Sequence, residues 1–419
     1  MKAVAVVGAG WAGLAAAVRA TRDGHRVTLF EMARQPGGRA RSVAWRDDQL
    51  DNGQHILIGA YVQTLALMRE VGVDPDAVLK RLPLAMTLPD GSGLRLPPGP
   101  PIAAFARGVL AHRGWPLRHR LALLMHATGW ALRRFRCDEH LTVAQLCGRI
   151  PGELRRDLID PLCIAALNTP AEAASAAVFL RVLRDALFSG PGSADLLLPR
   201  RPLGELLPEA ALAWLQQHAV PLKLGVRVEQ VERDGAGWAV NGDRFDTVVL
   251  ACTAVEAARL AGAVAPDWAA AASALRYEPI ITISVGSAGT TLAAPMVLLR
   301  DGPAQFVFDH GALGSKPRRF SFVISGARVW VDRGREATEA AVLAQARTQF
   351  AAGTWAQPPA VQVSMTEQRA TFACTPALRR PARLIAPGLL AAGDYVSGPY
   401  PATLEGAVRS GNEAAAMLG

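Results

Sequence analysis

The sequence predicts an α/β fold from three observations. A nearly all-apolar run at residues 2–7 leads directly into closely spaced glycines and a helical pattern, as in a strand buried in a parallel sheet. A second apolar run, residues 389–392, ends in Gly-Asp and precedes another helical pattern, and further candidate strands lie between residues 280 and 366. We therefore expect a Rossmann-like domain built from both ends of the chain, interleaved with a second domain that holds a mixed β-sheet and a mostly helical insert.

The glycines after the first strand have the spacing of a dinucleotide-binding fingerprint. Gly8 allows the tight turn, Gly10 lets the backbone approach a pyrophosphate, and Gly13 lets the helix at 12–21 pack closely on the strand. Glu31 ends the second strand, where an acid hydrogen-bonds ribose hydroxyls. The dinucleotide contacts predicted here are Gly8, Gly10, Trp11, Ala12, Gly13 and Glu31. This fingerprint alone fits NAD or FAD.

A second glycine pair, Gly37 and Gly38, is followed by Arg39. Two adjacent glycines permit another close approach of backbone to phosphate, and Arg39 supplies a cationic donor. The alternative is a glycine turn with a solvated arginine. The segment resembles the GGR element of the flavin-dependent amine oxidase and phytoene desaturase superfamily, and this resemblance implies FAD.

The C-terminal block favours the same cofactor. The apolar run ends at Gly393 and Asp394, and a helical pattern begins near Thr403 and Leu404. In the superfamily it resembles, this acid lies on the ribityl–phosphate part of FAD, and the helix presents its N-terminus to the isoalloxazine ring, where the helix dipole favours negative charge. A helix cap or loop acid is the alternative for Asp394. The resemblance also places Val228 near the adenine.

Length and composition fit a two-domain enzyme, with 419 residues of which 50% are hydrophobic. We expect the FAD-binding domain to comprise residues 1–60, 203–268 and 371–419, and the substrate domain residues 61–202 and 269–370. No apolar stretch reaches the ~18–20 residues of a membrane span. The N-terminus has no secretory pattern, and the five cysteines lack metal-ligand spacing. A cytoplasmic protein with reduced thiols and no metal is expected.

Basic residues are concentrated between residues 107 and 136, in a chain of formal net charge +9. Seven arginines and three histidines alternate there with leucines, a methionine and two tryptophans. This pattern predicts peripheral attachment to anionic lipid on the inner face of the cell membrane. A solvated basic helix face is an equally open alternative. Nucleic-acid binding is disfavoured because no recognised module accompanies the charge.

The remaining elements are predicted from periodicity. Residues 61–200 are expected to be mostly helical, with loops at 88–101 and 189–202. A hairpin around Asp234 and Gly235 would join strands at 226–231 and 238–240, followed by a buried strand at 246–251. The second sheet would contain strands at 280–285, 305–308, 320–325 and 361–366.

Four blocks resemble the hydroxysqualene dehydroxylase family of FAD-dependent enzymes, and the resemblance covers essentially the whole chain. They are DNGQHILIGAY (51–61), PLCIAALNTP (161–170), VFLRVLRDALFSGPGSADLLLPR (178–200) and GDYVSGPYPATLEGAVRSG (393–411). The resemblance implies reductive removal of the allylic hydroxyl of hydroxysqualene, a C30 isoprenoid alcohol, to give squalene in bacterial hopanoid biosynthesis. It also implies a long apolar tunnel, coupling to other squalene-pathway enzymes and an external flavin reductant.

That chemistry needs a proton donor, because hydroxyl is a poor leaving group until it is protonated. His55 is the first candidate, since it follows the Asp-x-Gly element that passes the flavin in relatives. Asp195 and Tyr400 are further candidates, and a cap, ion-pair or buried structural role is the alternative for each. Two other activities stay open: a carotenoid desaturase, and an amine or porphyrinogen oxidase. The oxidase activity is disfavoured because amine oxidation in these folds usually uses an aromatic pair at the flavin, and of the four tyrosines only Tyr395 and Tyr400 lie near the flavin motif.

Overall fold

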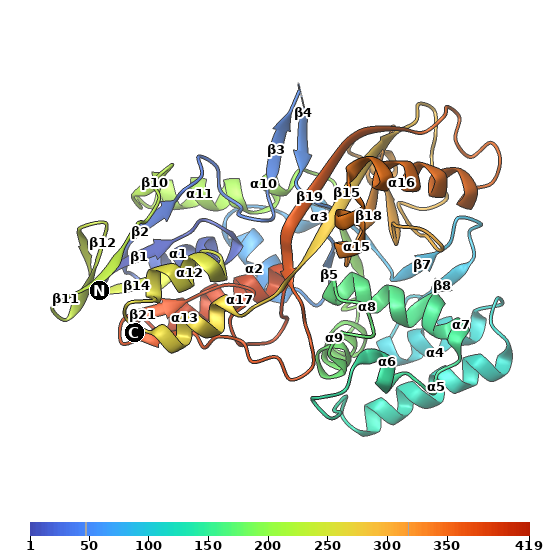
Figure 1. Ribbon diagram of the computed structural model, residues 1–419, viewed down its shortest axis with the longest axis horizontal. Coiled ribbons are helices and arrows are strands. Elements are labelled where there is room, and N and C mark those ends of the chain that lie inside the picture. The colour runs from blue at the N-terminus through green and yellow to red at the C-terminus, as the bar shows by residue number, and fades with distance from the viewer. Residues whose placement is uncertain (47, 317) are drawn as a thin grey trace.

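The computed structural model describes residues 1–46, 48–316 and 318–419. Figure 1 shows an elongated molecule with two lobes, and both chain termini lie in one of them. The lobe with the termini holds a six-stranded sheet, and the other holds a five-stranded sheet beside a group of helices. Two long strands, β15 (Tyr277–Gly286) and β19 (Ala360–Phe372), run from the first lobe into the second.

The six-stranded sheet has the order β10-β2-β1-β14-β21-β20, and every pair except β21-β20 is parallel. Its strands come from three separate stretches of chain: β1 (Ala3–Val7), β2 (Arg26–Glu31), β10 (Leu222–Leu224), β14 (Thr247–Leu250), β20 (Leu384–Ala386) and β21 (Leu389–Ala391). Helices α1 (Trp11–Arg22), α11 (Pro208–Gln217) and α17 (Leu404–Ala416) cover one face, and α12 (Ala254–Ala261) packs on the other. The predicted α/β class is confirmed.

The predicted hairpin is present, with a later start. Strands β11 (Val231–Asp234) and β12 (Gly237–Val240) pair around the predicted turn, and β13 (Asp243–Phe245) completes the small sheet. The prediction of strand for residues 226–230 is wrong. Backbone N–H groups there are engaged outside a ladder, because Asn241 Oδ1 accepts from Glu229 N–H at 2.8 Å and Val226 N–H donates to Glu31 O at 3.0 Å.

The second sheet is antiparallel and has the order β16-β17-β18-β15-β19, which confirms the four strands predicted there. Two of the predicted strands are β17 (Phe306–Asp309) and β18 (Arg319–Ile324), and the fifth strand, β16 (Met296–Leu298), is not predicted from the sequence. One face packs against α15 (Arg328–Arg333) and α16 (Arg335–Gln349). The other face packs toward the helical insert and belongs to the largest core cluster.

The insert at 61–200 contains more strand than the sequence predicts. Strands interrupt both predicted loops and the region before them: β6 (Leu79–Leu82), β7 (Ala85–Thr87), β8 (Gly93–Arg95) and β9 (Leu196–Pro199). Strand β9 pairs with β6 and with β5 (Leu57–Ile58), and such distant pairing leaves no local signal. The helices of the insert are α2 (Val62–Glu70), α3 (Pro75–Val78), α4 (Pro101–Ala111), α5 (Leu117–Leu132), α6 (Val143–Leu146), α7 (Gly152–Leu154), the π-helix Arg155–Ile159, α8 (Asp160–Leu167) and α9 (Ala176–Phe188). Helix α10 (Leu203–Leu206) follows the insert.

Other short elements join these units: the hairpin of β3 (Ser42–Trp45) and β4 (Asp48–Asp51), and helices α13 (Pro266–Ser273) and α14 (His310–Leu313). Within the described residues, no helix is both long enough and apolar enough to span a bilayer.

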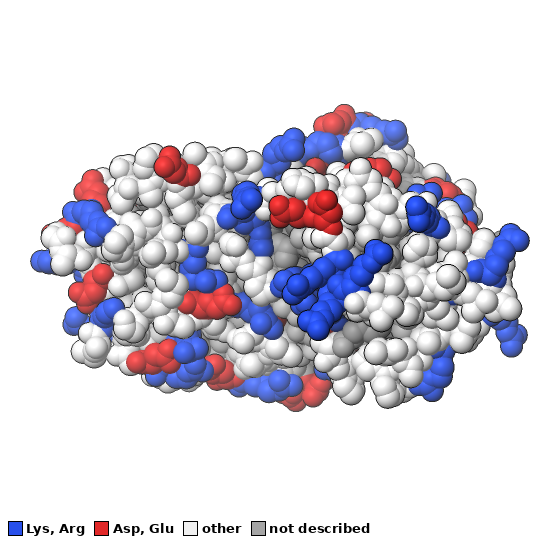
Figure 2. All heavy atoms as spheres, turned by 90° about the horizontal axis from the view of Figure 1, so that it is seen from below, with Lys and Arg blue, Asp and Glu red and all other residues white. Residues whose placement is uncertain are grey.

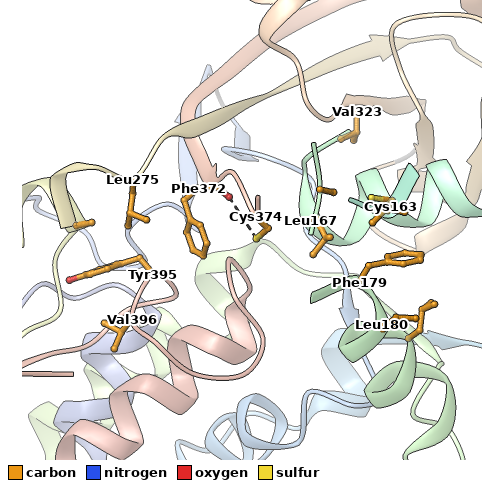
Figure 3. Close-up of a cluster of buried hydrophobic side chains, with 14 of the residues drawn as sticks. Cys163, Leu167, Phe179, Leu180, Leu275, Val323, Phe372, Cys374, Tyr395 and Val396 are labelled. Atoms are coloured by element: carbon orange, nitrogen blue, oxygen red, sulfur yellow. Dashed lines mark hydrogen bonds between the residues drawn. The ribbon is translucent and has the colours of Figure 1, made fainter. Parts of the chain in front are cut away.

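One hydrophobic cluster connects the lobes. Figure 3 shows Tyr395 on the side of the six-stranded sheet and Phe179 on the helical insert, with Phe372 and Cys374 between them. The block at 161–170 fastens this junction. Its Asn168, at φ +48°, donates from Nδ2 to Glu278 O at 3.1 Å, and Thr169 Oγ1 accepts from Cys374 N–H at 3.2 Å. This block, which carries part of the family resemblance, therefore serves the architecture.

Candidate cofactor and active site

The two glycine motifs contact each other at the carboxyl end of β1. Gly37 N–H donates to Ala9 O at 2.8 Å, and a Cβ on Gly38 would lie 3.2 Å from Gly10 Cα. Trp11 Nε1 donates to Ala40 O at 3.0 Å and fastens the second motif to the start of α1. The sequence predicts the two motifs, and the structure brings them together.

The geometry of the first motif fits a pyrophosphate. Gly8 has φ +110°, and a Cβ on Gly13 would lie 1.8 Å from Gly8 O, so a side chain at Gly13 clashes with the turn. A Cβ on Gly10 would meet nothing nearer than Gly38 Cα, at 3.9 Å, so the space before Gly10 is open. Helix α1 has no side-chain cap at its N-cap residue Gly10, and its first N–H groups are available to an anion.

Glu31 lies beside this cradle and already accepts two backbone bonds. Its Oε2 accepts from Ala9 N–H at 2.7 Å and its Oε1 from Ala33 N–H at 2.8 Å. Each carboxylate oxygen keeps acceptor capacity for a ribose hydroxyl. Val228 is buried two residues beyond the segment that bonds Glu31 O, and its own carbonyl accepts from Arg259 at 2.8 Å. Ala12 is buried in α1.

Arg39 and Asp394 form an ion pair across 355 residues of sequence. The Asp394 side chain is 8% exposed, and Arg39 also donates to Ala370 O on β19 at 2.9 Å. Before Asp394, Gly393 N–H donates to Ser410 Oγ at 3.1 Å, which ties this turn to α17. The predicted cationic donor and the predicted flavin acid thus occupy one site at the junction of the lobes.

Helix α17 begins beside this pair. Thr403 is its N-cap and accepts from Gly406 N–H at 3.0 Å, and Leu404 is its first residue. The fully buried Glu405 accepts from Thr64 N–H at 2.9 Å, caps α2, and forms an ion pair with Arg409 at 2.7 Å. The sequence does not identify this capping role, because it depends on a contact between residues 341 positions apart in the chain.

All four tyrosines of the chain gather here. The rings of Tyr61 and Tyr400 meet edge to face with centroids 6.2 Å apart, and the Arg409 guanidinium lies 4.9 Å from the Tyr400 centroid. The charges of Arg39 and Asp394 act on Tyr277 and Tyr395, and burial raises the pKa of both hydroxyls. The sequence alone does not single out Tyr61 or Tyr277. Their signal was rarity, since 419 residues contain four tyrosines.

His55 follows the segment that supports the second glycine motif. Asn52 donates to Arg39 O, and its Oδ1 accepts from Arg41 N–H at 3.2 Å. His55 Nδ1 lies 3.1 Å from Gly53 O. Burial lowers the pKa of the His55 imidazole more than the hydrogen bond with Gly53 O raises it, and the Arg39 charge lowers it further, so the neutral ring is favoured. A neutral ring that donates from Nδ1 to Gly53 O leaves Nε2 as an acceptor.

Asp51, before it, accepts from Ser42 Oγ and from Leu203 N–H, each at 2.8 Å. It caps α10 and fixes the β3–β4 hairpin. Asp195, the second proposed acid, pairs with Arg81 on β6 at 3.0 Å, and its carbonyl accepts from Gly59 N–H at 2.9 Å. In the described parts of the chain, no hydrogen bond or ion pair joins the Asp195 side chain to Arg39 or Asp394. Its contacts are those of a residue that fixes a loop.

The site therefore combines an open backbone cradle for phosphates, an acid for ribose, an ion pair with a buried carboxylate, and protonated tyrosines at a junction between two sheets. This combination defines a two-domain flavin-dependent oxidoreductase. The family model described as "Flavin containing amine oxidoreductase" matches residues 11–418, and the chain belongs to this family. It is an FAD-dependent oxidoreductase.

The chain is similar over its whole length to curated relatives. It is 29% identical over 453 residues to hydroxysqualene dehydroxylase of Rhodopseudomonas palustris, covering 100% of this chain and 98% of that protein. The identity to hydroxysqualene dehydroxylase of Sinorhizobium fredii is 29%, with 99% and 97% covered. Carotenoid phi-ring synthase of Streptomyces griseus is 30% identical over 67% of this chain and 59% of its own length.

Among solved structures, an oxidoreductase from Methanosarcina mazei superposes with a TM-score of 0.76 and 16% identity, with both chains fully covered. This likeness supports the fold.

Proposed function

We propose that the protein catalyses reductive removal of the allylic hydroxyl of hydroxysqualene to give squalene. The observation that carries this proposal is the full-length similarity to hydroxysqualene dehydroxylases, together with a site built for FAD. In the reaction the C–O bond breaks, the hydroxyl takes one proton and leaves as water, and a C–H bond forms with two electrons. FAD, when bound and reduced by an external reductant, would supply those two electrons as hydride.

The chain's own groups have three tasks in this scheme. The backbone around Gly10 and Gly38, with Glu31, Arg39 and Asp394, would hold the cofactor. The buried junction would exclude water from a cationic allylic centre. The third task is proton delivery, which we assign to His55, with Tyr400 as second candidate. The imidazolium form of His55 would donate a proton from Nε2 while Nδ1–H keeps its hydrogen bond to Gly53 O.

A carotenoid desaturase is the second candidate, favoured by a partial similarity to zeta-carotene desaturase of Arabidopsis thaliana, which is 30% identical over 29% of this chain. Desaturation removes hydrogen and needs oxidised cofactor, so the two activities have opposite redox directions. The test is anaerobic incubation of the FAD-loaded protein with hydroxysqualene and a reductant, followed by mass-spectrometric identification of products, alongside oxidised protein with phytoene. Squalene from the first incubation supports the proposal. A dehydrogenated polyene from the second, with no squalene from the first, rejects it.

We further propose that helices α4 and α5 attach the protein to anionic lipid on the cytoplasmic side of the membrane. Residues 91–137 contain eight arginines and no acid. The two helices expose six large apolar side chains: Ile102, Leu110, Leu117, Leu121, Met125 and Leu132. In Figure 2, the lower right-hand part of the face shows blue atoms among white ones, on the side of the molecule where these helices lie. Apolar side chains among arginines match the interfacial region of an anionic bilayer, which would also hold the isoprenoid substrate.

A further inference from the structure

The inner face of the second sheet carries hydroxyl side chains between apolar ones. On the central strand β15, Ile281, Ile283 and Val285 alternate into the core beneath α15 and α16. Thr282 and Ser284 therefore point to the opposite face, toward the helical insert. Ser284 pairs in register with Ser321 of β18. Apolar members of this face are Met296, Leu298, Phe306, Phe308 and Val323.

Two of these hydroxyls are buried without a partner. Thr282 is 4% exposed and Ser284 is 3% exposed. Neither Thr282 Oγ1 nor Ser284 Oγ has a hydrogen-bond partner within residues 1–46, 48–316 and 318–419. Burying an unpaired hydroxyl destabilises a fold, so an orphaned pair on one strand indicates a partner that is not part of the chain.

Ser321, directly across from Ser284, is held by a histidine. His310 Nε2 lies 2.7 Å from Ser321 Oγ. Burial, followed by the Arg319 charge, lowers the pKa of His310 to about 4, so its imidazole is neutral at physiological pH. The adjacent Asp309 carboxylate accepts from Leu292 N–H at 2.9 Å. The Ser321 hydroxyl is thus oriented by a neutral partner, and its oxygen keeps capacity for a further bond.

Two of these three hydroxyl side chains lie on β15, a strand that also reaches the cofactor site. At the other end of β15, Tyr277 responds to the charges of Arg39 and Asp394, and Arg39 donates to Ala370 O on β19. On the inner face of β19, Met365 is the register partner of Thr282 and is only half-buried. The inner face of the sheet is therefore incompletely covered beside Thr282.

We propose that Thr282 and Ser284, with Ser321, bind the hydroxyl group of the substrate alcohol. The inference rests on the proposed function and deepens it, because it assigns the groups that distinguish an oxygenated isoprenoid from a hydrocarbon. An alcohol satisfies the orphaned hydroxyls, whereas squalene leaves them unpaired. A site that hydrogen-bonds a substrate hydroxyl discriminates strongly against the analogue that lacks it. The same three hydroxyls favour product release, since squalene has no oxygen with which they could form a hydrogen bond.

The test uses Thr282→Val and Ser284→Ala, each of which removes a hydroxyl at nearly constant shape. Ser364→Ala is the matched control, because Ser364 lies on the opposite face of the sheet and bonds Glu339 at 2.6 Å. Dissociation constants for hydroxysqualene and squalene are measured on the FAD-loaded protein in detergent micelles. Thr282→Val and Ser284→Ala should each weaken hydroxysqualene binding about 2- to 10-fold and leave squalene binding unchanged. The control should keep the preference for the alcohol.

Thermal unfolding of the ligand-free proteins is the second readout. Removing an orphaned hydroxyl should leave the unfolding temperature unchanged or raised, whereas loss of a structural hydrogen bond would lower it. Variants that retain the full preference for hydroxysqualene overturn this inference. If those variants and the wild type still form squalene, the proposed function stands. Wild-type protein that binds both ligands equally overturns the inference, and absence of squalene in the turnover assay then rejects the proposed function separately.

Discussion

The cofactor lobe and the helical insert use the same residue types under different constraints. In the cofactor lobe, Gly13 is fixed by the backbone, because a Cβ there would lie 1.8 Å from Gly8 O. In α5 of the insert, a Cβ on Gly129 would meet nothing within 4 Å. Residue identity is readable from sequence where the backbone dictates it. It is less readable where side chains from distant segments decide it, as at Asn168.

Replacement of a glycine by alanine, made separately at Gly13 and at Gly129, tests this comparison with the largest expected effect on folding. Gly13→Ala should prevent formation of the β1–α1 turn, so the protein should fail to fold or to retain FAD. Gly129→Ala should retain FAD and unfold at the same or a higher temperature, because alanine in a helix is favoured by about 0.5–1 kcal/mol. Flavin absorbance of the purified proteins and thermal unfolding measure both. A yellow, stably folded Gly13→Ala protein would contradict the comparison.

The same contrast explains what the sequence predicts. The first strand, the glycine positions, Glu31 and the start of α17 at Thr403 follow from local patterns, and the structure places them as predicted. Strand β9 is absent from the prediction because its partners β5 and β6 lie more than a hundred residues earlier. The Tyr61–Tyr400 contact and the Arg39–Asp394 pair join residues that lie still farther apart in the sequence. A single sequence carries no signal for such contacts.

A variant of His55 tests whether this buried residue supplies the proton in squalene formation. His55→Ala should retain FAD and slow formation of squalene in a single turnover by ~10²–10⁴-fold, as for loss of a general acid. Because burial lowers the pKa of His55 and the acid form is required, the wild-type rate should rise as pH falls below about 6.5. The exposed His140→Ala variant is the control. A loss below roughly threefold would remove His55 from the mechanism and direct attention to Tyr400.

Variants of the arginines in the insert test whether the basic segment at residues 107–136 binds anionic lipid. Replacing Arg113, Arg118, Arg133 and Arg134 by Gln should weaken binding to anionic liposomes by on the order of 1,000-fold at low salt, since each contributes about 1 kcal/mol and about 1.4 kcal/mol is a tenfold change in affinity. Wild-type binding should fall as salt rises past physiological strength. Gln at four exposed arginines outside α4 and α5, namely Arg26, Arg200, Arg201 and Arg347, matches the charge change. Liposome binding is measured by co-sedimentation. If both quadruple variants lose the same amount of binding, the basic segment is only a solvated helix face.

The smallest effect separates two acids at opposite ends of β4. Burial raises the pKa of Asp51 to about 6. The ionised form is therefore disfavoured in the fold, and wild-type stability from this group falls as pH rises from about 4 to 6. Asp51→Asn should raise the free energy of unfolding at pH 7 by on the order of 2 kcal/mol and have little effect near pH 4.

Asp48 should behave in the opposite way. Although burial acts against it, hydrogen bonds from Lys316 and Gln49 lower the pKa of Asp48. Its contribution is present above about pH 4 and lost as pH falls below that value. Asp48→Asn should therefore destabilise the protein at pH 7 and become neutral in acid. Denaturant unfolding of both variants across this pH range measures the two signs, and equal signs would refute the assignment of the Asp51 carboxyl.

The most direct test of the central claim is an anaerobic titration of the reduced FAD-loaded protein with hydroxysqualene, followed by flavin absorbance and product analysis. The account predicts that the alcohol reoxidises the flavin and that one squalene forms for each flavin reoxidised. A flavin that stays reduced through excess hydroxysqualene, in protein that folds and binds FAD, would contradict it.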